Sequence, residues 1–86
     1  MILSWHPNAW EDYIEWQKVD KNIAKRINEL IKECLRTPKE GKGKPELLRS
    51  DLSGYWSRRI TDEHRLVYRI EMDCITIAQC KYHYSK

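Results

Sequence analysis

The fold is decided by residues 20–36, which read DKNIAKRINELIKECLR. Apolar side chains recur in this stretch at helical spacing: Ile23, Ile27, Leu30, Ile31, Cys34 and Leu35. Because residues three, four, seven and eight apart share one side of an α-helix, the pattern predicts an amphipathic helix packed on a core. Asp20 is a favourable N-cap and Thr37-Pro38 disfavours continuation, so the expected helix ends near Arg36.

Shorter elements flank this helix on both sides. Residues 1–5 are apolar and predict a strand, and Pro7 suits the first turn of a helix that runs through Lys18. Residues 37–54 contain two prolines and three glycines, which is typical of a loop. Three further strands are expected at residues 55–60, 65–71 and 74–84.

The order of these elements is β-α-α-β-β-β with short late connections. Such an order predicts an α+β fold, in which an antiparallel sheet carries two helices packed on one face. The chain of 86 residues is expected to form one domain, residues 1–86, near the small end of what folds alone.

Charge is distributed unevenly along the chain. The net charge is +3, but residues 36–86 carry eleven Lys and Arg against seven Asp and Glu, which gives +4. An anionic partner is therefore expected to meet the second half of the chain. A net charge of +3 also suits an ordinary solvated surface.

Three cysteines, Cys34, Cys74 and Cys80, form no C-x-x-C pair. They indicate neither a disulfide framework nor a zinc site, and we interpret them as small core residues in a reducing compartment. The first residues lack the basic segment of a signal peptide, and no stretch approaches the roughly 20 apolar residues of a membrane span. A cytoplasmic protein without membrane contact is expected.

Strand parity predicts two different faces of the sheet, because alternate residues of a strand point to opposite sides. The face expected under the helices comprises Trp56, Ile60, Leu66, Tyr68, Ile70, Ala78, Cys80 and Tyr82. Arg58 also falls on this face, and as a charged residue it is expected near a strand end or a sheet edge. The opposite face comprises Tyr55, Ser57, Arg59, Arg65, Val67, Arg69, Gln79, Lys81 and His83.

This opposite face carries five Arg, Lys or His side chains and no carboxylate. A solvated face usually mixes both signs, so an anion-binding face and a solvated face both stay open, since a register error of one residue would scatter the set. The loop at residues 36–49 is basic as well and suits a phosphate backbone or solvent equally. Its Gly-Lys-Gly-Lys run, residues 41–44, does not follow the Walker A pattern, which argues against nucleotide hydrolysis.

Metal-free cleavage of RNA needs a base for the 2′-hydroxyl, an acid for the departing 5′-oxygen and a cation for the phosphate oxygens. The chain supplies His83, an Arg cluster and several carboxylates, but spacing alone does not choose the base. We interpret His6, which precedes a proline outside the basic region, as structural. His64 lies in a predicted turn, where a structural and a substrate-contacting role stay equally open. We expect no metal and no cofactor.

Segments along nearly the whole chain resemble the YoeB-type toxins of the RelE superfamily. They are Asp20-Lys21, residues 25–32, Arg36-Thr37-Pro38, residues 40–46, Leu52-Ser53-Gly54, residues 56–61, residues 63–68 and Lys81-Tyr82-His83-Tyr84. No single segment is diagnostic, but their order and spacing make the match specific. The resemblance implies the RelE-like microbial RNase fold and a toxin of a bacterial type II toxin–antitoxin system.

The activity implied by this resemblance is ribosome-dependent endonucleolytic cleavage of mRNA in the A site. Glu46 would be the general base, Arg65 the transition-state cation and His83 the general acid. The implied substrate contacts are Lys44, Arg49, Arg59 and Tyr84. Arg49 stands where the family commonly has Lys, and residues 85–86 extend past the Tyr that usually closes the chain.

The same resemblance implies partners. They are a YefM-like cognate antitoxin that displaces the C-terminal segment on binding, the 70S ribosome with its mRNA, and a second copy in a homodimer. Contact with DNA is expected only indirectly, through the antitoxin complex. One alternative is a non-enzymatic, ParE-like gyrase inhibitor on the same fold. A solely regulatory DNA-binding protein is disfavoured, because the sequence has no helix-turn-helix pattern.

Overall fold

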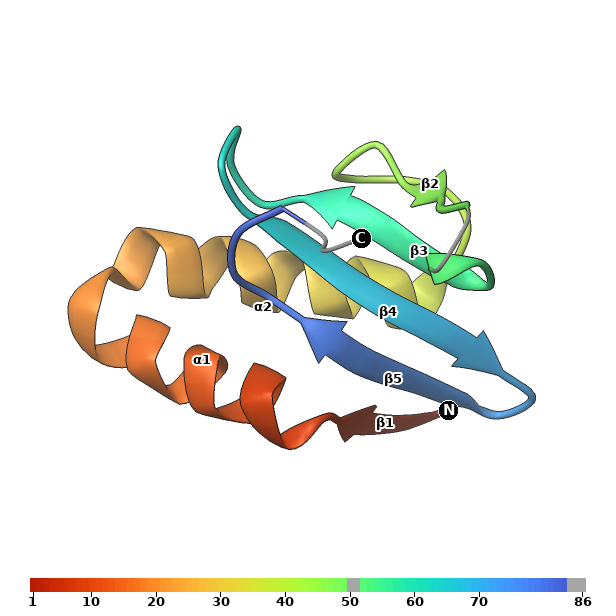
Figure 1. The fold of residues 1–86 in the computed structure, drawn as a ribbon, viewed down its shortest axis with the longest axis horizontal. Helices are drawn as coiled ribbons and strands as arrows, with labels where there is room; N and C mark the ends of the chain where they lie inside the picture. The colour runs from red at the N-terminus through yellow and green to blue at the C-terminus, as the bar shows by residue number, and fades with distance from the viewer. Residues whose placement is uncertain (50–51, 84–86) are drawn as a thin grey trace.

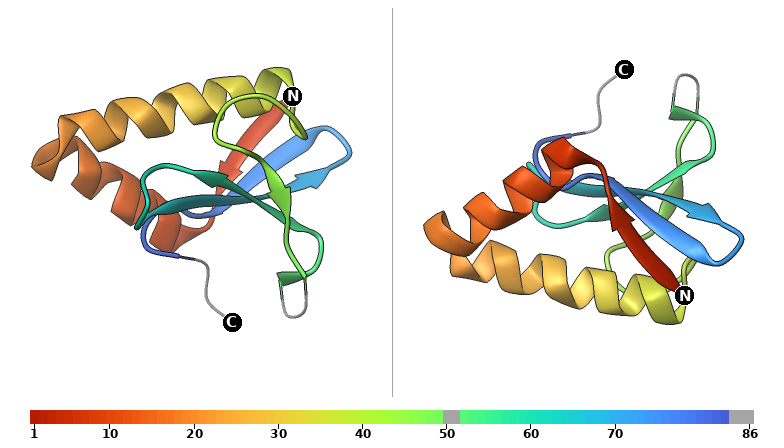
Figure 2. Two further views of the ribbon diagram at one scale, coloured as in Figure 1. Left: turned by 90° about the horizontal axis from the view of Figure 1, so that it is seen from above. Right: turned by 90° about the horizontal axis from the view of Figure 1, so that it is seen from below.

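The computed structural model describes residues 1–49 and 52–83 of the chain. The elements are β1 (Ile2–Trp5), α1 (Pro7–Val19), α2 (Lys21–Arg36), β2 (Glu46–Leu47), β3 (Tyr55–Arg59), β4 (Arg65–Glu71) and β5 (Cys74–Gln79). Figure 1 shows their arrangement, and the two views of Figure 2 show the helices gathered on one side of the sheet. The α+β class predicted from the sequence is confirmed.

The five strands lie in the order β1-β5-β4-β3-β2. The pairs of β5 with β4 and of β4 with β3 are antiparallel as predicted. The unforeseen β2 is also antiparallel to β3, whereas β1 runs parallel to β5, with Ile2 opposite Cys74. The sheet is therefore mixed. Two boundaries also differ from the prediction, because β2 forms inside the segment expected to be a loop, and β5 ends at Gln79 instead of residue 84.

Helix α2 supplies one wall of the core. Its N-cap is Asp20, whose Oδ1 accepts hydrogen bonds from the backbone N–H of Asn22 at 3.1 Å and of Ile23 at 3.2 Å. The buried residues along it are Ala24, Ile27, Leu30, Ile31 and Cys34, which confirms the amphipathic pattern. Among the described residues, no helix has the length and hydropathy that crossing a membrane requires.

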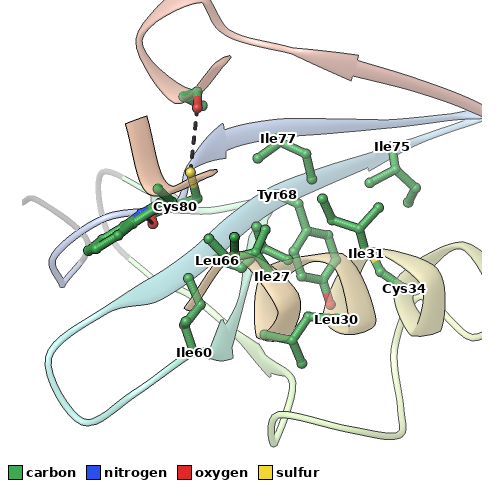
Figure 3. Packing of buried hydrophobic residues seen from close by; sticks show 13 residues of the cluster. Ile27, Leu30, Ile31, Cys34, Ile60, Leu66, Tyr68, Ile75, Ile77 and Cys80 are labelled. Carbon is green, nitrogen blue, oxygen red and sulfur yellow. Dashed lines mark hydrogen bonds between the residues drawn. The ribbon is translucent and has the colours of Figure 1, made fainter. Parts of the chain in front are cut away.

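The core lies between α2 and the strands β4 and β5 (Figure 3). Leu66 and Tyr68 of β4 and Ile75 and Ile77 of β5 are fully buried there. Burying one large aliphatic or aromatic side chain stabilises the fold by about 1.5–3 kcal/mol. This cluster therefore explains why the helices cover this face of the sheet and leave the other one open.

The buried face of β5 differs from the predicted one. Ile75 and Ile77 point into the core in place of Ala78, which is half-buried. Cys80 is buried as predicted. Tyr82 is exposed instead of buried, because it lies beyond the end of the strand.

A β-bulge causes this change of face. Val67 of β4 pairs with Gln79, whereas the next residue, Tyr68, pairs with Ile77. Ala78 is thus an extra residue on β5, and the in–out alternation reverses around it. The bulge keeps Gln79 on the open face, beside Val67, while the start of the strand fills the core.

The two fully buried cysteines behave as core residues. Cys34 and Cys80 are buried and Cys74 is half-buried, and all three thiols are free. Burial raises the pKa of Cys80 to about 12 and also raises that of Cys34, so both thiols stay neutral. A neutral thiol is a poor nucleophile, which leaves these two residues a packing role.

The guanidinium of Arg58 lies inside the protein, between β3 and the segment that follows α2. The residue is near the strand end, as predicted, but it is fully buried. Its Nη1 donates to the carbonyl of Lys42 at 2.8 Å, and its Nη2 donates to those of Thr37 at 2.6 Å and Glu40 at 2.9 Å. Backbone carbonyls thus replace water around a buried charge.

Tyr68 completes this arrangement from the sheet. Its hydroxyl accepts a hydrogen bond from Arg58 Nε at 2.9 Å and donates one to the carbonyl of Pro38 at 2.8 Å. Burial raises the pKa of Tyr68 to about 12, so the hydroxyl retains the proton that it donates. Together these bonds attach residues 37–42 to the sheet.

Glu33 anchors the same segment from the helix. Its carboxylate accepts hydrogen bonds from Arg36 and, at 3.2 Å, from the backbone N–H of Lys42, and a side chain at Gly41 would collide with it. The Arg36 bond is the main cause that lowers the pKa of Glu33 below its usual value. The stabilisation from these bonds to the Glu33 carboxylate is therefore fully present above the usual pKa of a Glu carboxyl. It is lost as the pH falls through the lowered pKa of Glu33.

Replacing Arg58 by Met tests the attachment of residues 37–42. The variant leaves the Tyr68 hydroxyl and several carbonyls without their donor, so we expect the free energy of unfolding to fall by about 3–5 kcal/mol. Urea unfolding followed by tryptophan fluorescence measures this loss. The control is Arg36→Met, which removes an exposed Arg from the last turn of α2 and should lower stability much less. Equal losses would contradict the role given to Arg58.

Candidate active site

The sheet face turned away from the helices is hollowed by an open pocket of about 560 Å³. The residues that line it are Lys44, Pro45, Glu46, Ser57, Arg59, Arg65 and His83. They come from the loop before β2, from β2, β3 and β4, and from the segment after β5. The structure thus brings together five of the seven site residues expected from the sequence.

Strand register sets the floor of the pocket. Glu46 pairs with Ser57, which pairs in turn with Val67, and Arg59 pairs with Arg65 two residues further along the strands. Paired residues of neighbouring strands project to the same side. One carboxylate and two guanidinium groups therefore share the open face, which parity had predicted as purely cationic because β2 was not foreseen.

The loop before β2 turns sharply at Gly43 and Lys44, whose φ angles are +85° and +52°. The carbonyl of Gly43 accepts a hydrogen bond from the N–H of Arg59 at 2.7 Å. A Cβ at Gly43 would lie 2.8 Å from Cδ2 of Leu30, so this position needs glycine for space as well as for conformation. The bond holds the loop against β3 and brings Lys44 and Glu46 to the pocket.

Arg65 is held at the pocket by the turn between β3 and β4. Its Nη1 donates to the carbonyls of Thr61 at 2.6 Å, Asp62 at 3.1 Å and His64 at 3.1 Å. The residue is half-buried. Since Arg stays protonated at all ordinary pH values, this turn gives the site a fixed positive charge.

Arg59 is the more exposed of the two pocket arginines. Its Nη1 lies 3.6 Å from Oδ1 of Asp62, whose side chain is fully exposed. A surface pair of this kind contributes little to stability. A phosphate group can therefore replace Asp62 as the partner of Arg59, with the stronger bidentate geometry that guanidinium offers to phosphate.

His83 enters the pocket from the C-terminal segment. Its Nε2 lies 3.0 Å from the carbonyl oxygen of Asp62. A carbonyl can only accept, so Nε2 carries the proton. The exposed imidazole therefore presents an N–H donor beside the turn that holds Arg65.

His64, whose role the sequence left open, is a buried structural residue in this fold. It is only 7% exposed, and its ring packs edge-on against Trp16 with the centroids 4.9 Å apart. Its Nδ1 accepts a hydrogen bond from the backbone N–H of Tyr82 at 2.8 Å. A ring enclosed in this way has no face left for substrate.

Of the two remaining expected substrate contacts, one lies away from the pocket and the other is not among the described residues. Arg49 is exposed and lies past β2, outside the pocket lining, so its role stays a prediction. Tyr84 lies outside the described residues. Conversely, the site prediction left out Ser57 and Pro45, of which Ser57 could have been found, because strand parity had placed it on this face.

The pocket combines a proton acceptor, a proton donor and two fixed cations. The carboxylate of Glu46 can accept a proton, Nε2 of His83 can give one, and Arg59 and Arg65 can bind phosphate oxygens. These are the groups that acid–base chemistry at a phosphodiester requires. Within residues 1–49 and 52–83, no three His, Cys, Asp or Glu side chains gather as metal ligands.

Known proteins resemble this chain over almost its full length. Residues 5–84 match the family of YoeB-like toxins of bacterial type II toxin–antitoxin systems. The toxin YoeB of Escherichia coli K12 is 61% identical over 84 residues, which cover 98% of this chain and 100% of the relative. A YoeB/ParE toxin from Agrobacterium tumefaciens superposes with a TM-score of 0.95 at 48% identity, over 98% of this chain and 100% of that one. YoeB of Staphylococcus aureus, solved as a dimer and in a heterotetrameric YoeB–YefM complex, gives a TM-score of 0.90 at 52% identity over 98% of both chains.

The loop that carries Lys44 and Glu46 can be tested at Gly43. Gly43→Ala forces a Cβ against Leu30 and a side chain into a positive φ, so we expect the free energy of unfolding to fall by about 2 kcal/mol or more. The matched control is Gly54→Ala, since Gly54 has a φ of +91° but no atom within 4 Å of the added Cβ. Urea midpoints of the two variants separate the packing cost from the backbone cost. Identical midpoints would show that the loop is not packed against α2 as described.

Proposed function

The chain belongs to the YoeB-like toxins of bacterial type II toxin–antitoxin systems, and we propose that it is a ribosome-dependent endoribonuclease. It would cut mRNA in the A site and so inhibit translation. The observation that carries this proposal is the convergence of Glu46, Arg65 and His83 on one open pocket. These residues lie far apart in the sequence, and a module that only binds needs no acid matched to a base.

In the proposed reaction Glu46 takes the proton of the ribose 2′-hydroxyl, and the 2′-oxygen attacks the adjacent phosphorus. The bond from phosphorus to the 5′-oxygen breaks, and His83 protonates that oxygen as it leaves. The products are a 2′,3′-cyclic phosphate and a free 5′-hydroxyl. The mechanism needs no metal ion and no cofactor.

The arginines act on the charge that gathers during this step. Arg65 is fixed by its turn and stabilises the phosphate oxygens in the transition state. Arg59 exchanges its weak partner Asp62 for the phosphate and holds the substrate. Lys44 at the rim adds a further positive charge, and Arg49 and Tyr84 are proposed as additional contacts to the RNA.

The partners proposed for this chain follow from its relatives. YoeB of S. aureus is solved as a dimer and in complex with YefM. We propose that this chain likewise forms a homodimer and is neutralised by a YefM-like antitoxin. Its other partners would be the 70S ribosome and translated mRNA in the cytoplasm, and DNA contact would arise only through the antitoxin complex.

Primer extension on a translated reporter mRNA tests the activity. Wild-type protein should produce 5′ ends inside the A-site codon, and His83→Gln and Glu46→Ala should each reduce cleavage by about 10²-fold or more, because each removes one proton-transfer group. The matched controls are His6→Gln and Glu11→Ala, which make the same changes outside the pocket and should cleave like wild type.

Two outcomes would overturn the proposed function. One is a Glu46→Ala, His83→Gln double variant that cleaves at the wild-type rate. The other is intact mRNA in cells that the wild-type protein still kills. Gyrase-dependent DNA breaks in those cells would identify the chain as a binding toxin instead.

A further inference from the structure

The side-chain amide of Gln79 binds the segment after β5 at three successive residues. Nε2 of Gln79 donates to the carbonyls of Lys81 at 2.9 Å, Tyr82 at 3.3 Å and His83 at 2.6 Å. Three successive carbonyls thus converge on one donor group at the end of the strand. The β-bulge makes this possible, because it turns Gln79 toward the open face, where the segment crosses.

His64 holds the same segment from the other side. Its Nδ1 accepts the N–H of Tyr82 at 2.8 Å, and the indole N–H of Trp16 donates to the carbonyl of Cys80 at 3.0 Å. Nδ1 is an acceptor here, so the neutral ring carries its proton on Nε2, which lies 3.6 Å from Oε1 of Glu63. The imidazole is therefore fixed in orientation and tautomer.

Tyr82 is bound at both ends of its backbone unit. Its N–H is bonded to His64, and its carbonyl accepts from Gln79 and, at 2.9 Å, from the backbone N–H of Arg65. Its φ of +62° is unfavourable for a residue with a side chain and persists only where the surroundings determine it. This left-handed turn sets the direction in which the next residue, His83, leaves the backbone.

We propose that Gln79 and His64 are positioning residues that hold the turn at residues 80–83 and so aim the imidazole of His83 at the leaving oxygen. The proposal rests on the proposed function for the role of His83, but the held turn can be measured without any cleavage. Neither residue touches the substrate in this mechanism. They act through the backbone of Tyr82.

The position of His83 explains why its imidazole needs positioning residues. Its side chain is exposed and lies on a segment without regular secondary structure, so the core does not orient it. Proton donation requires the acid within hydrogen-bond reach of the departing oxygen, and a misplacement of about 1 Å can cost roughly 10²-fold in rate. His64 lies in the turn that holds Arg65, and the Tyr82 carbonyl bound by Gln79 also accepts from the N–H of Arg65, so the acid and the cation are positioned together.

Gln79→Glu is the sharpest test, because it keeps the shape of the side chain but replaces the donor by an acceptor that repels the three carbonyls. We expect kcat for cleavage of ribosome-bound mRNA to fall roughly tenfold to a hundredfold while KM stays within about twofold. Gln79→Leu removes the donor without adding charge and should also lower kcat. The matched control is Gln17→Glu, on an exposed turn of α1, which should leave both constants unchanged.

His64→Phe separates packing from hydrogen bonding at the second position. The Phe ring can still pack against Trp16 but offers no acceptor to the N–H of Tyr82. Amide hydrogen exchange should then be at least about tenfold faster at Tyr82 than in wild type, and Gln79→Glu should have a similar effect. The NMR signals of the His83 ring should move in both variants and remain unchanged in Gln17→Glu.

These readouts separate the two proposals. If wild-type protein does not cleave mRNA, the proposed function fails, while amide exchange at Tyr82 and the NMR signals of the His83 ring still decide whether the turn is held. Wild-type amide exchange at Tyr82 together with wild-type His83 ring signals in both Gln79→Glu and His64→Phe would overturn the positioning role. A normal kcat in Gln79→Glu, despite faster exchange at Tyr82, would overturn it as well.

Discussion

The buried charge of Arg58 is the constraint on which the rest of the structure depends. A guanidinium without water must find oxygen acceptors, and Arg58 finds them in Tyr68 and in the carbonyls of residues 37–42. The chain after α2 therefore folds back over the sheet instead of running into solvent. A hydrophobic residue at this position would fill the same space, but it would not bind the carbonyls that make the loop fold back over the sheet.

The course of residues 37–42 over the sheet places the residues that follow them at the pocket. Once residues 37–42 are attached, Gly43 reaches the N–H of Arg59, and the next residues pair with β3 as the short strand that carries Glu46. Arg58 and Arg59 are neighbours that point to opposite faces of the sheet. The side chain of Arg58 thus binds the loop from the core, and the side chain of Arg59 lies in the pocket that the loop helps to form. Stability and the geometry of the site are coupled through two consecutive residues.

The parts of this fold that depend on local periodicity could be predicted from the sequence, and the parts that depend on long-range pairing could not. The apolar face of α2 and the placement of Arg59 and Arg65 on one sheet face follow from residue spacing. The bulge at Ala78 has no local signal, so parity failed for the start of β5 and for Ala78 itself. Two residues are too few for a period, which is why β2 was missed. The choice of Glu46 as the proposed base needed the family resemblance, since only the pairing of β2 with β3 brings that carboxylate to the site.

The parallel pairing of β1 with β5 has a consequence for the order in which the molecule can be built. Ile2 lies opposite Cys74, so β1 can pair only after both helices and the other strands that separate it from β5 in the sequence have been made. Pairings between such distant residues form late and only after the intervening chain is available. The segment that carries His83 follows still later. The sheet edge formed by β1 and the segment that carries His83 are therefore among the last parts of the fold to be assembled.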